Sequence, residues 1–251
     1  MTAVVTGAAT GIGAAIARAL ASAGHRVAVT DRDAEAAAAT AATIEGALPF
    51  SMDVRDRTSI ETASRDAVAA LGPLDIWVSC AGVSSMARFI DLSDEEIDLN
   101  LDVNTRGTLI CGQVAARQFI DQGGGGCIIN IASMAGKRGG VPLLAHYVAS
   151  KFAVVGLTQA MACELAAHDI RVNSVCPGYV RTGMQDREII WEAQLKGIST
   201  GEVVDFYFAD TPLRRLQTPE DVAAVALFLA SEAASSITGE SVAVNGGSFM
   251  D

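Results

Sequence analysis

Tyr147 and Lys151, four residues apart in a stretch with helical spacing, are the pair best suited to chemistry in this 251-residue chain. Residues i and i+4 of a helix share a face, so the Lys151 ammonium can lie beside the Tyr147 phenol. A neighbouring cation favours the phenolate and lowers the phenol pKa from about 10. A phenol tuned in this way can act as a general acid or base. The pair alone would also fit an ordinary helix surface.

A glycine-rich turn gives a second signal. The apolar run that ends at Thr6 leads into a turn containing Gly7, Thr10, Gly11, Ile12 and Gly13, and a helical pattern follows at once. This strand, turn and helix order brings backbone close to a pyrophosphate at a helix N-terminus. Glycines that only permit a tight turn are the alternative. Asp31, 18 residues beyond Gly13, ends the next run and can accept hydrogen bonds from ribose hydroxyls.

The same carboxylate favours one dinucleotide. Asp31 would repel the 2′-phosphate of NADP and pair with the free hydroxyls of NAD, so the expected cofactor is NAD, although Arg32 beside it could soften the choice. Asp53 ends the third run and can reach the adenine amino group. It could equally be the N-cap of a helix over residues 55–71.

These residues sit in an alternation of short apolar runs and longer Ala-rich helical stretches. Parallel neighbours need crossover connections, and strands buried on both faces are continuously apolar. We therefore expect one α/β domain over residues 1–251, a Rossmann fold with a seven-stranded parallel doubly wound sheet and helices on both faces. A polar and aromatic segment near 183–212 is expected to be a lid. The predicted strands are residues 3–6, 26–31, 48–53, 74–80, 127–133, 170–176 and 241–244.

Helix signals support the alternation. Ser93 precedes three acidic residues and should cap a long helix over about 93–121, and Thr218 should cap a helix that begins at Pro219. A further long helix is expected over about 145–167. Both long helices are rich in small and apolar residues, more than one sheet face can cover, which indicates a homo-oligomer.

Composition excludes several classes of partner. The net charge is −11 and the pI is about 4.7, so the chain should repel nucleic acid and anionic membranes. No signal peptide or long apolar run is evident, and no membrane association is expected. The five cysteines have no C-x-x-C spacing and fit reduced thiols in the cytoplasm. Acids and histidines lack metal-ligand spacing, so no metal is expected; His146 is interpreted as structural rather than as a catalytic base.

Five elements in order resemble the short-chain dehydrogenase/reductase family over nearly the whole chain. They are Thr-Gly-x-x-x-Gly-x-Gly at residues 6–13, Asn-x-x-Gly at 104–107, Ser133, Tyr147-x-x-x-Lys151, and Pro177-Gly178. The resemblance implies that Tyr147 is the general acid/base, that Lys151 lowers its pKa and binds the nicotinamide ribose, that Ser133 binds the substrate oxygen, and that Asn104 anchors a proton-relaying water. The cofactor-binding residues that motif and resemblance together imply are Gly7, Thr10, Gly11, Ile12, Gly13, Asp31, Asp53, Val54, Cys80, Ala81, Gly82, Tyr147, Lys151, Pro177, Gly178, Val180 and Thr182.

The sequence departs from the family at one motif. Ala81 and Gly82 match the end of the family's Asn-Asn-Ala-Gly, but Ser79 and Cys80 replace both asparagines. The missing amides put local stability or cofactor affinity in doubt, while no hydride or proton step is lost.

The lid and the chain end are similar to those of family members that act on sugar alcohols and small vicinal diols, and the family is commonly tetrameric. Gln185, Glu188 and Gln194 could bind several hydroxyls, or could form the outer face of a lid helix. The leading hypothesis is an NAD-dependent polyol or diol dehydrogenase that forms a tetramer or dimer. The alternatives are a 3-oxoacyl-[acyl-carrier-protein] reductase, which Asp31 and the net charge disfavour, and a non-catalytic dinucleotide-binding regulator.

Overall fold

Seven parallel strands form the central sheet of the computed structural model, which describes residues 1–250; Asp251 lies outside them. The strand order is β3-β2-β1-β4-β5-β6-β7, and every neighbouring pair is parallel. The predicted doubly wound α/β fold is therefore confirmed. The strands are β1 (Thr2–Thr6), β2 (Arg26–Asp31), β3 (Ala47–Ser51), β4 (Leu74–Ser79), β5 (Gly126–Ile131), β6 (Ile170–Pro177) and β7 (Ser241–Val244).

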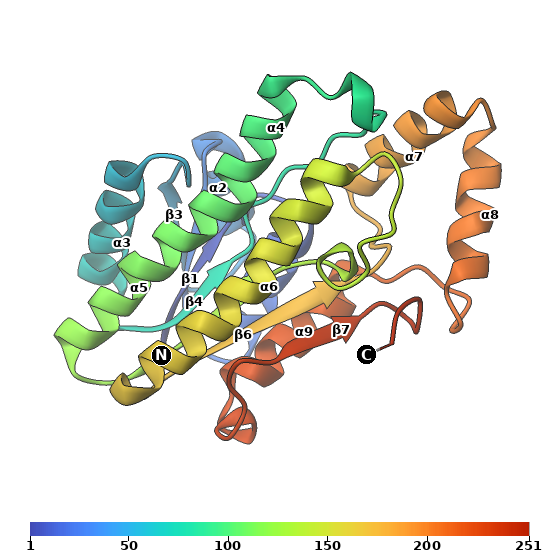
Figure 1. Ribbon diagram of the computed structural model, residues 1–251. Helices are drawn as coiled ribbons and strands as arrows, with labels where there is room; N and C mark the ends of the chain where they lie inside the picture. The colour runs from blue at the N-terminus through green and yellow to red at the C-terminus, as the bar shows by residue number, and fades with distance from the viewer. Residues whose placement is uncertain (251) are drawn as a thin grey trace.

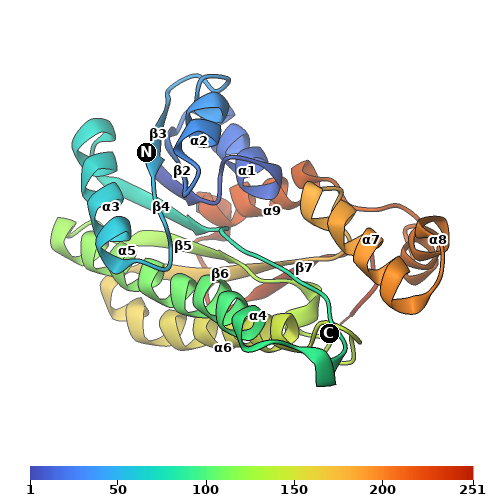
Figure 2. The same cartoon turned by 90° about the horizontal axis from the view of Figure 1, so that it is seen from above.

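Helices cover both faces of this sheet (Figures 1 and 2). One apolar cluster joins β1 and β2 to α1, α2 and α9, with Ile16 and Leu229 fully buried. A second cluster on the other face joins the sheet to α3, α5 and α6 through Trp77 and Phe119. The helices are α1 (Gly11–Ser22), α2 (Ala34–Ala41), α3 (Arg57–Leu71), α4 (Asp94–Asn100), α5 (Thr108–Gln122), α6 (Ala145–Leu165), α7 (Gly183–Lys196), α8 (Thr200–Asp210) and α9 (Pro219–Ala230).

The predicted caps of α4 and α9 are present as reciprocal capping boxes. Ser93 and Glu96 satisfy each other's backbone N–H at the start of α4, and Thr218 and Asp221 do the same at α9. The long helix expected over 93–121 is interrupted, however, because residues 101–107 form a π-helical segment between α4 and α5. A π-bulge adds a residue to a helix turn and is frequent at functional sites. The bulge contains Asn104.

The N-cap interpretation of Asp53 is wrong. The cap of α3 is Asp56, whose side chain accepts a hydrogen bond of 2.9 Å from the Thr58 N–H. Asp53 lies between β3 and α3 and is held instead by Arg55, with Nη2 to Oδ2 at 2.6 Å. The Asp53 carboxylate therefore binds the Arg55 side chain and does not cap α3.

The lid segment consists of the helices α7 and α8, which extend beyond the carboxyl ends of the strands (Figure 1). They pack together through Ala193, Val203 and Tyr207, which form a small separate core with Leu216. The Tyr207 ring stacks on Tyr179, with centroids 4.0 Å apart and planes at 14°. This small core fixes the lid at the end of β6.

One helical stretch, residues 145–168, has the length and hydropathy that a membrane-spanning helix would also have. It begins with α6, which packs on β6 and is buried along one side through Val154 and Ala162. The same stretch carries Tyr147 and Lys151 into the cavity described next.

Candidate active site

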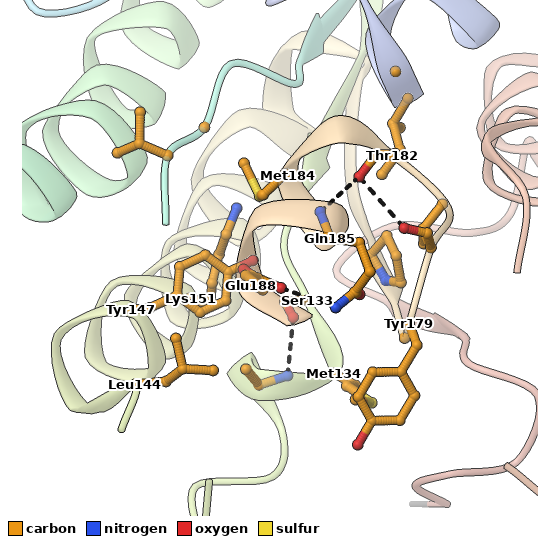
Figure 3. A pocket seen from close by; sticks show the side chains of 18 of the residues that line it. Ser133, Met134, Leu144, Tyr147, Lys151, Tyr179, Thr182, Met184, Gln185 and Glu188 are labelled. Atoms are coloured by element: carbon orange, nitrogen blue, oxygen red, sulfur yellow. Dashed lines mark hydrogen bonds between the residues drawn. The ribbon is translucent and has the colours of Figure 1, made fainter. Parts of the chain in front are cut away.

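A cavity of about 840 Å³ lies at the carboxyl ends of the strands, between the sheet and α7. In open α/β sheets this edge is where ligands bind. The residues of the predicted site that line it are Gly7, Thr10, Gly11, Ile12, Gly13, Asp31, Cys80, Gly82, Ser133, Tyr147, Lys151, Pro177, Gly178, Val180 and Thr182. Asp53, Val54, Ala81 and Asn104 do not line it. Figure 3 shows the catalytic end of the cavity.

The glycine turn leaves no room for side chains. Gly7 has φ +62°, and a Cβ there would lie 2.6 Å from Ala81 Cα; a Cβ at Gly13 would lie 2.3 Å from the Gly7 carbonyl oxygen. Thr10 begins α1 without a side-chain cap, so the first N–H groups of this helix keep their donor capacity. Backbone donors at an uncapped helix start fit a pyrophosphate. The turn thus fits the dinucleotide that its sequence predicts.

Asp31 ends β2 beside this turn. Its Oδ2 accepts a 3.3 Å hydrogen bond from the Ala9 N–H, and its Oδ1 accepts one of 3.1 Å from the Asp33 N–H. A carboxylate has about four acceptor positions, so both oxygens can still accept from ribose hydroxyls. Arg32 is exposed next to it. The adjacent Asp53 is different, because Arg55 contacts both of its oxygens and lowers the pKa of that carboxyl.

The Ser79-Cys80 departure changes the end of β4. The Ser79 hydroxyl is buried without a hydrogen-bond partner, and burial raises the pKa of the Cys80 thiol to about 12. The strand end is held by Thr6, whose Oγ1 accepts from the N–H groups of Cys80 and Ala81 at 3.0 Å each. Thr6 therefore secures β1 to the end of β4, where no asparagine amide is present.

Lys151 and Tyr147 meet on one face of α6. Lys151 is 6% exposed, its Nζ lies 5.6 Å from the centroid of the Tyr147 ring, and it donates a 2.9 Å hydrogen bond to the Ile131 carbonyl. Burial lowers the pKa of Lys151 to about 8. For Tyr147, burial and the negative charge of Glu188 raise the pKa, while a hydrogen bond to Ser133 opposes them. The side chains alone therefore shift the Tyr147 pKa in the direction opposite to the one expected from the Tyr-Lys spacing.

Ser133 stands at the end of β5 and caps the short helical turn that follows. Its Oγ accepts a 3.1 Å hydrogen bond from the Ala135 N–H, as Figure 3 shows. The hydroxyl hydrogen can then point into the cavity, on the side where Ser133 interacts with Tyr147. The predicted strand to residue 133 ends at Ile131, because this turn takes the chain out of the sheet.

Asn104 is buried behind the cavity wall. Its amide oxygen accepts from the Val83 N–H at 2.9 Å, and its Nδ2 donates to the Val83 carbonyl at 2.9 Å and to Ser150 Oγ at 3.0 Å. A Cβ at Gly82 would lie within 3.4 Å of Asn104 Oδ1 and 3.7 Å of Lys151 Nζ, so both side chains border the same glycine. The amide fixes the loop after β4, and the relay role stays a prediction.

The far end of the cavity is built on β6 and the start of α7. A Cβ at Gly178 would lie 2.8 Å from Asn245 Cα, so glycine is required where this loop passes the end of β7. Thr182 caps α7 by accepting a 3.3 Å hydrogen bond from the Gln185 N–H. A Cβ placed on Gly11 would lie 3.5 Å from Thr182 Cγ2, so the two residues are neighbours. The two predicted halves of the cofactor site therefore face each other.

The lid contributes a polar wall. Gln185 is 7% exposed and Glu188 faces the cavity, whereas Gln194 is exposed and does not line it. The outer-face interpretation is thus right for Gln194 and wrong for the other two. Glu188 Oε1 accepts a 2.5 Å hydrogen bond from Ser84, and its Oε2 accepts one of 3.2 Å from Gln185 Nε2.

Sequence reasoning missed a second polar group in this wall. Glu192, one helical turn after Glu188, accepts a hydrogen bond from the Tyr207 hydroxyl and pairs with Lys196. Farther along, Arg138 pairs with Asp210 at 2.9 Å, and Tyr179 donates to Asp210 at 3.1 Å. The i, i+4 spacing of Glu188 and Glu192 is the signal that could have found the first of these groups.

Two other expectations concern histidine and metal. His146 is buried, its Nε2 is 2.8 Å from Ser85 Oγ, and it does not line the cavity, in agreement with a structural role. No group of three or more His, Cys, Asp or Glu residues able to hold a metal ion occurs within residues 1–250.

Comparison with known proteins agrees with this geometry. A family profile described as "Enoyl-(Acyl carrier protein) reductase" matches residues 7–248. A sorbitol dehydrogenase of Cereibacter sphaeroides is 38% identical, with 99% of this chain and 97% of that protein covered. A (3R)-3-hydroxyacyl-CoA dehydrogenase of Mus musculus is also 38% identical, with 99% and 96% covered. The crystal structure of a sorbitol-6-phosphate 2-dehydrogenase from Erwinia amylovora superposes with a TM-score of 0.94 at 35% identity, with 99% and 100% covered. With its parallel sheet, its glycine turn and its Tyr-Lys pair, the chain belongs to the short-chain dehydrogenase/reductase family.

Proposed function

We propose that this oxidoreductase interconverts a secondary alcohol of a polyol or small diol and the corresponding ketone, with NAD as its cofactor. The observation that carries the substrate class is the polar wall opposite Tyr147, where Gln185 and Glu188 turn into the cavity. A substrate with several hydroxyls can pair with such groups. An acyl chain would leave the remaining hydrogen-bonding positions of these groups unfilled beside an apolar surface, which costs free energy.

NAD supplies hydride acceptance when bound. The glycine turn and the start of α1 would hold its pyrophosphate, Asp31 its adenosine ribose, and Lys151 its nicotinamide ribose. The choice of NAD over NADP rests on Asp31, whose carboxylate stands at the end of β2 with acceptor positions left on both oxygens. A 2′-phosphate placed there would meet a like charge.

Tyr147, Lys151 and Ser133 handle the proton and the substrate oxygen. Ser133 donates a hydrogen bond to the alcohol oxygen, and the proton of that hydroxyl passes to the Tyr147 phenolate as the carbonyl forms. In the reverse direction Tyr147 returns the proton. The Lys151 ammonium stabilises the phenolate, and Asn104 would hold a water that carries protons onward from Lys151.

Two cationic side chains that line the cavity form ion pairs with carboxylates. Arg138 is paired with Asp210, and Lys196 is paired with Glu192. Each of these two cations already has a carboxylate partner, so an anionic substrate group would have to compete with Asp210 or Glu192 for it. Arg187 lines the mouth of the cavity and is exposed.

Nicotinamide absorbance during turnover tests the proposal. Hexitols, pentitols and 2,3-butanediol isomers are offered with NAD and with NADP, and an acetoacetyl thioester with NADH and NADPH. Turnover of a polyol or diol with NAD is expected. Thioester reduction alone, particularly with NADPH, would instead favour the acyl reductase, and a fully inactive protein that binds NADH would favour the regulator.

We also propose that the protein is a tetramer or dimer. Leu109, Ile120 and Phe152 on α5 and α6 are each about two fifths exposed, which leaves apolar area on adjoining helices. Light scattering after size exclusion measures the mass in solution, and a mass near 25.9 kDa would refute the proposal.

A further inference from the structure

Glu188 is a carboxylate that faces the catalytic end of the cavity, and the charge of Arg187 beside it in the sequence acts on it without forming an ion pair. It projects from α7 toward the side that holds Tyr147 and Lys151 (Figure 3). No lysine or arginine of the described residues 1–250 forms an ion pair with it. Its two hydrogen-bond partners are the neutral side chains of Ser84 and Gln185.

The hydrogen bonds leave Glu188 able to accept more. Each carboxylate oxygen has two acceptor positions, and each accepts one hydrogen bond here. Glu192, the other carboxylate of this wall, differs because one oxygen pairs with Lys196 and the other accepts from Tyr207. Its partners are a cation and a phenol, so its charge is already balanced. Of these two carboxylates, Glu188 is therefore the one whose oxygens can each accept a further hydrogen bond and whose charge is not balanced by an ion pair.

The position of a further donor is set by Tyr147. Glu188 and Tyr147 both line the cavity and lie at the same end of it in Figure 3. After burial, the negative charge of Glu188 is the next cause that raises the Tyr147 pKa. A hydroxyl bound to Tyr147 is about 2.7 Å from the phenol oxygen, and a hydroxyl on the next carbon is within reach of a second group nearby. Ser84 and Gln185 hold the carboxylate in place from the β4 loop and from α7, so its direction is fixed before substrate binds.

We propose that Glu188 determines substrate specificity by accepting a hydrogen bond from a second hydroxyl, on the carbon next to the one that reacts. This inference rests on the proposed function and narrows it to vicinal diols and polyols. A mono-alcohol leaves the remaining acceptor positions of the carboxylate without a donor, and a site built to hydrogen-bond a hydroxyl rejects the analogue that lacks it. A carboxylate on the neighbouring carbon would be repelled.

The experiment compares 2,3-butanediol with 2-butanol, both oxidised with NAD, in the wild type, Glu188→Leu and Glu188→Gln. The wild type should prefer the diol in kcat/KM. Glu188→Leu should lower kcat/KM for the diol by about 10- to 100-fold and change that for 2-butanol by less than about threefold, since a hydrogen bond to a charged group is lost for one substrate only. Glu188→Gln should fall between, mainly through a higher KM for the diol. Effects of the substitution on Tyr147 change the rates with both substrates, so they cancel in the ratio of kcat/KM for 2,3-butanediol to kcat/KM for 2-butanol.

The matched control is Gln194→Leu, on the exposed side of the same helix, which should leave both rates unchanged. Binding of NADH, followed by its fluorescence, checks that each variant is folded; if the leucine variant fails this check, the ratio in the isosteric Glu188→Gln decides. A wild-type preference that survives in the folded Glu188 variants would overturn the role of Glu188 and leave the polyol function standing. A wild type that oxidises both alcohols equally would overturn the inference and leave the proposed function standing. A wild type that oxidises neither alcohol, and no hexitol or pentitol either, would refute both.

Discussion

The Lys151 ammonium lies 5.6 Å from the centre of the Tyr147 ring while donating a 2.9 Å hydrogen bond to the Ile131 carbonyl. An ammonium has three donors, so two remain for a ribose and for the phenol. The bond to Ile131 fixes the side chain against the end of β5. Lys151 is thereby held between the cofactor side and the proton-transfer side of the cavity.

Replacement of Tyr147 by phenylalanine removes the group proposed to carry the proton. We expect kcat for alcohol oxidation to fall by about 10²- to 10⁴-fold, the usual contribution of general acid–base catalysis. The binding constant for NADH should change little, because the ring and its packing remain. Initial-rate absorbance assays measure kcat, and fluorescence titration measures the binding constant for NADH. Retention of full activity in Tyr147→Phe would remove the proposed mechanism.

Glu188, together with the larger effect of burial, should contribute to the pH dependence of the same step. Its negative charge raises the Tyr147 pKa, so its removal in Glu188→Gln lowers that pKa. Oxidation requires the phenolate, and the acid limb of the kcat/KM profile should therefore move to lower pH. A profile from pH 6 to 11 with 2-butanol as substrate measures the shift without the second hydroxyl. Asp186→Asn, an exposed acid on the same helix, is the control and should leave the midpoint in place. A midpoint that stays or rises in Glu188→Gln would contradict the coupling.

Much of the fold could be predicted because the central strands β1, β4 and β5 are short, largely apolar runs bounded by turns. Ile128 and Ile129 on β5, for example, are both fully buried although they point to opposite faces. The break at 101–107 could not be predicted, since a π-bulge inserts one residue and leaves the apolar pattern on both sides nearly unchanged.

Some residues of the candidate site could likewise be predicted from the sequence, and others could not. Tyr147, Lys151 and Ser133 meet because their positions follow from elements whose order the sequence reveals. Glu192 was missed because the cavity face of α7 is polar like its solvent face, so periodicity cannot distinguish the two faces. The direction of the Tyr147 pKa also depends on burial, which spacing does not report.

Asp31 should control the choice between dinucleotides. Asp31→Ser removes the charge that would repel a 2′-phosphate and keeps a small hydroxyl, so the ratio of kcat/KM with NAD to that with NADP should fall by about 100-fold. Arg32→Ala, at the exposed neighbour, is expected to reduce only the use of NADP. Initial rates with each cofactor at saturating alcohol give the ratios. An unchanged ratio in Asp31→Ser would show that Asp31 does not select the cofactor.

Tyr207 should stabilise the lid through Glu192. The Tyr207 hydroxyl donates to a carboxylate that is only 6% exposed, so Tyr207→Phe leaves a buried acceptor with one partner fewer. We expect the free energy of unfolding to fall by about 1 to 3 kcal/mol, the cost of such a group. Urea unfolding followed by circular dichroism measures it, and because phenylalanine keeps the ring that stacks on Tyr179, the difference reports the lost hydroxyl. Because burial and Glu192 raise the Tyr207 pKa in the folded protein, this stabilisation should be complete below about pH 10, the unfolded value, and should decline above it. A difference between wild type and Tyr207→Phe that persists unchanged at pH 11, or that is absent at pH 7, would contradict the role given to this hydrogen bond.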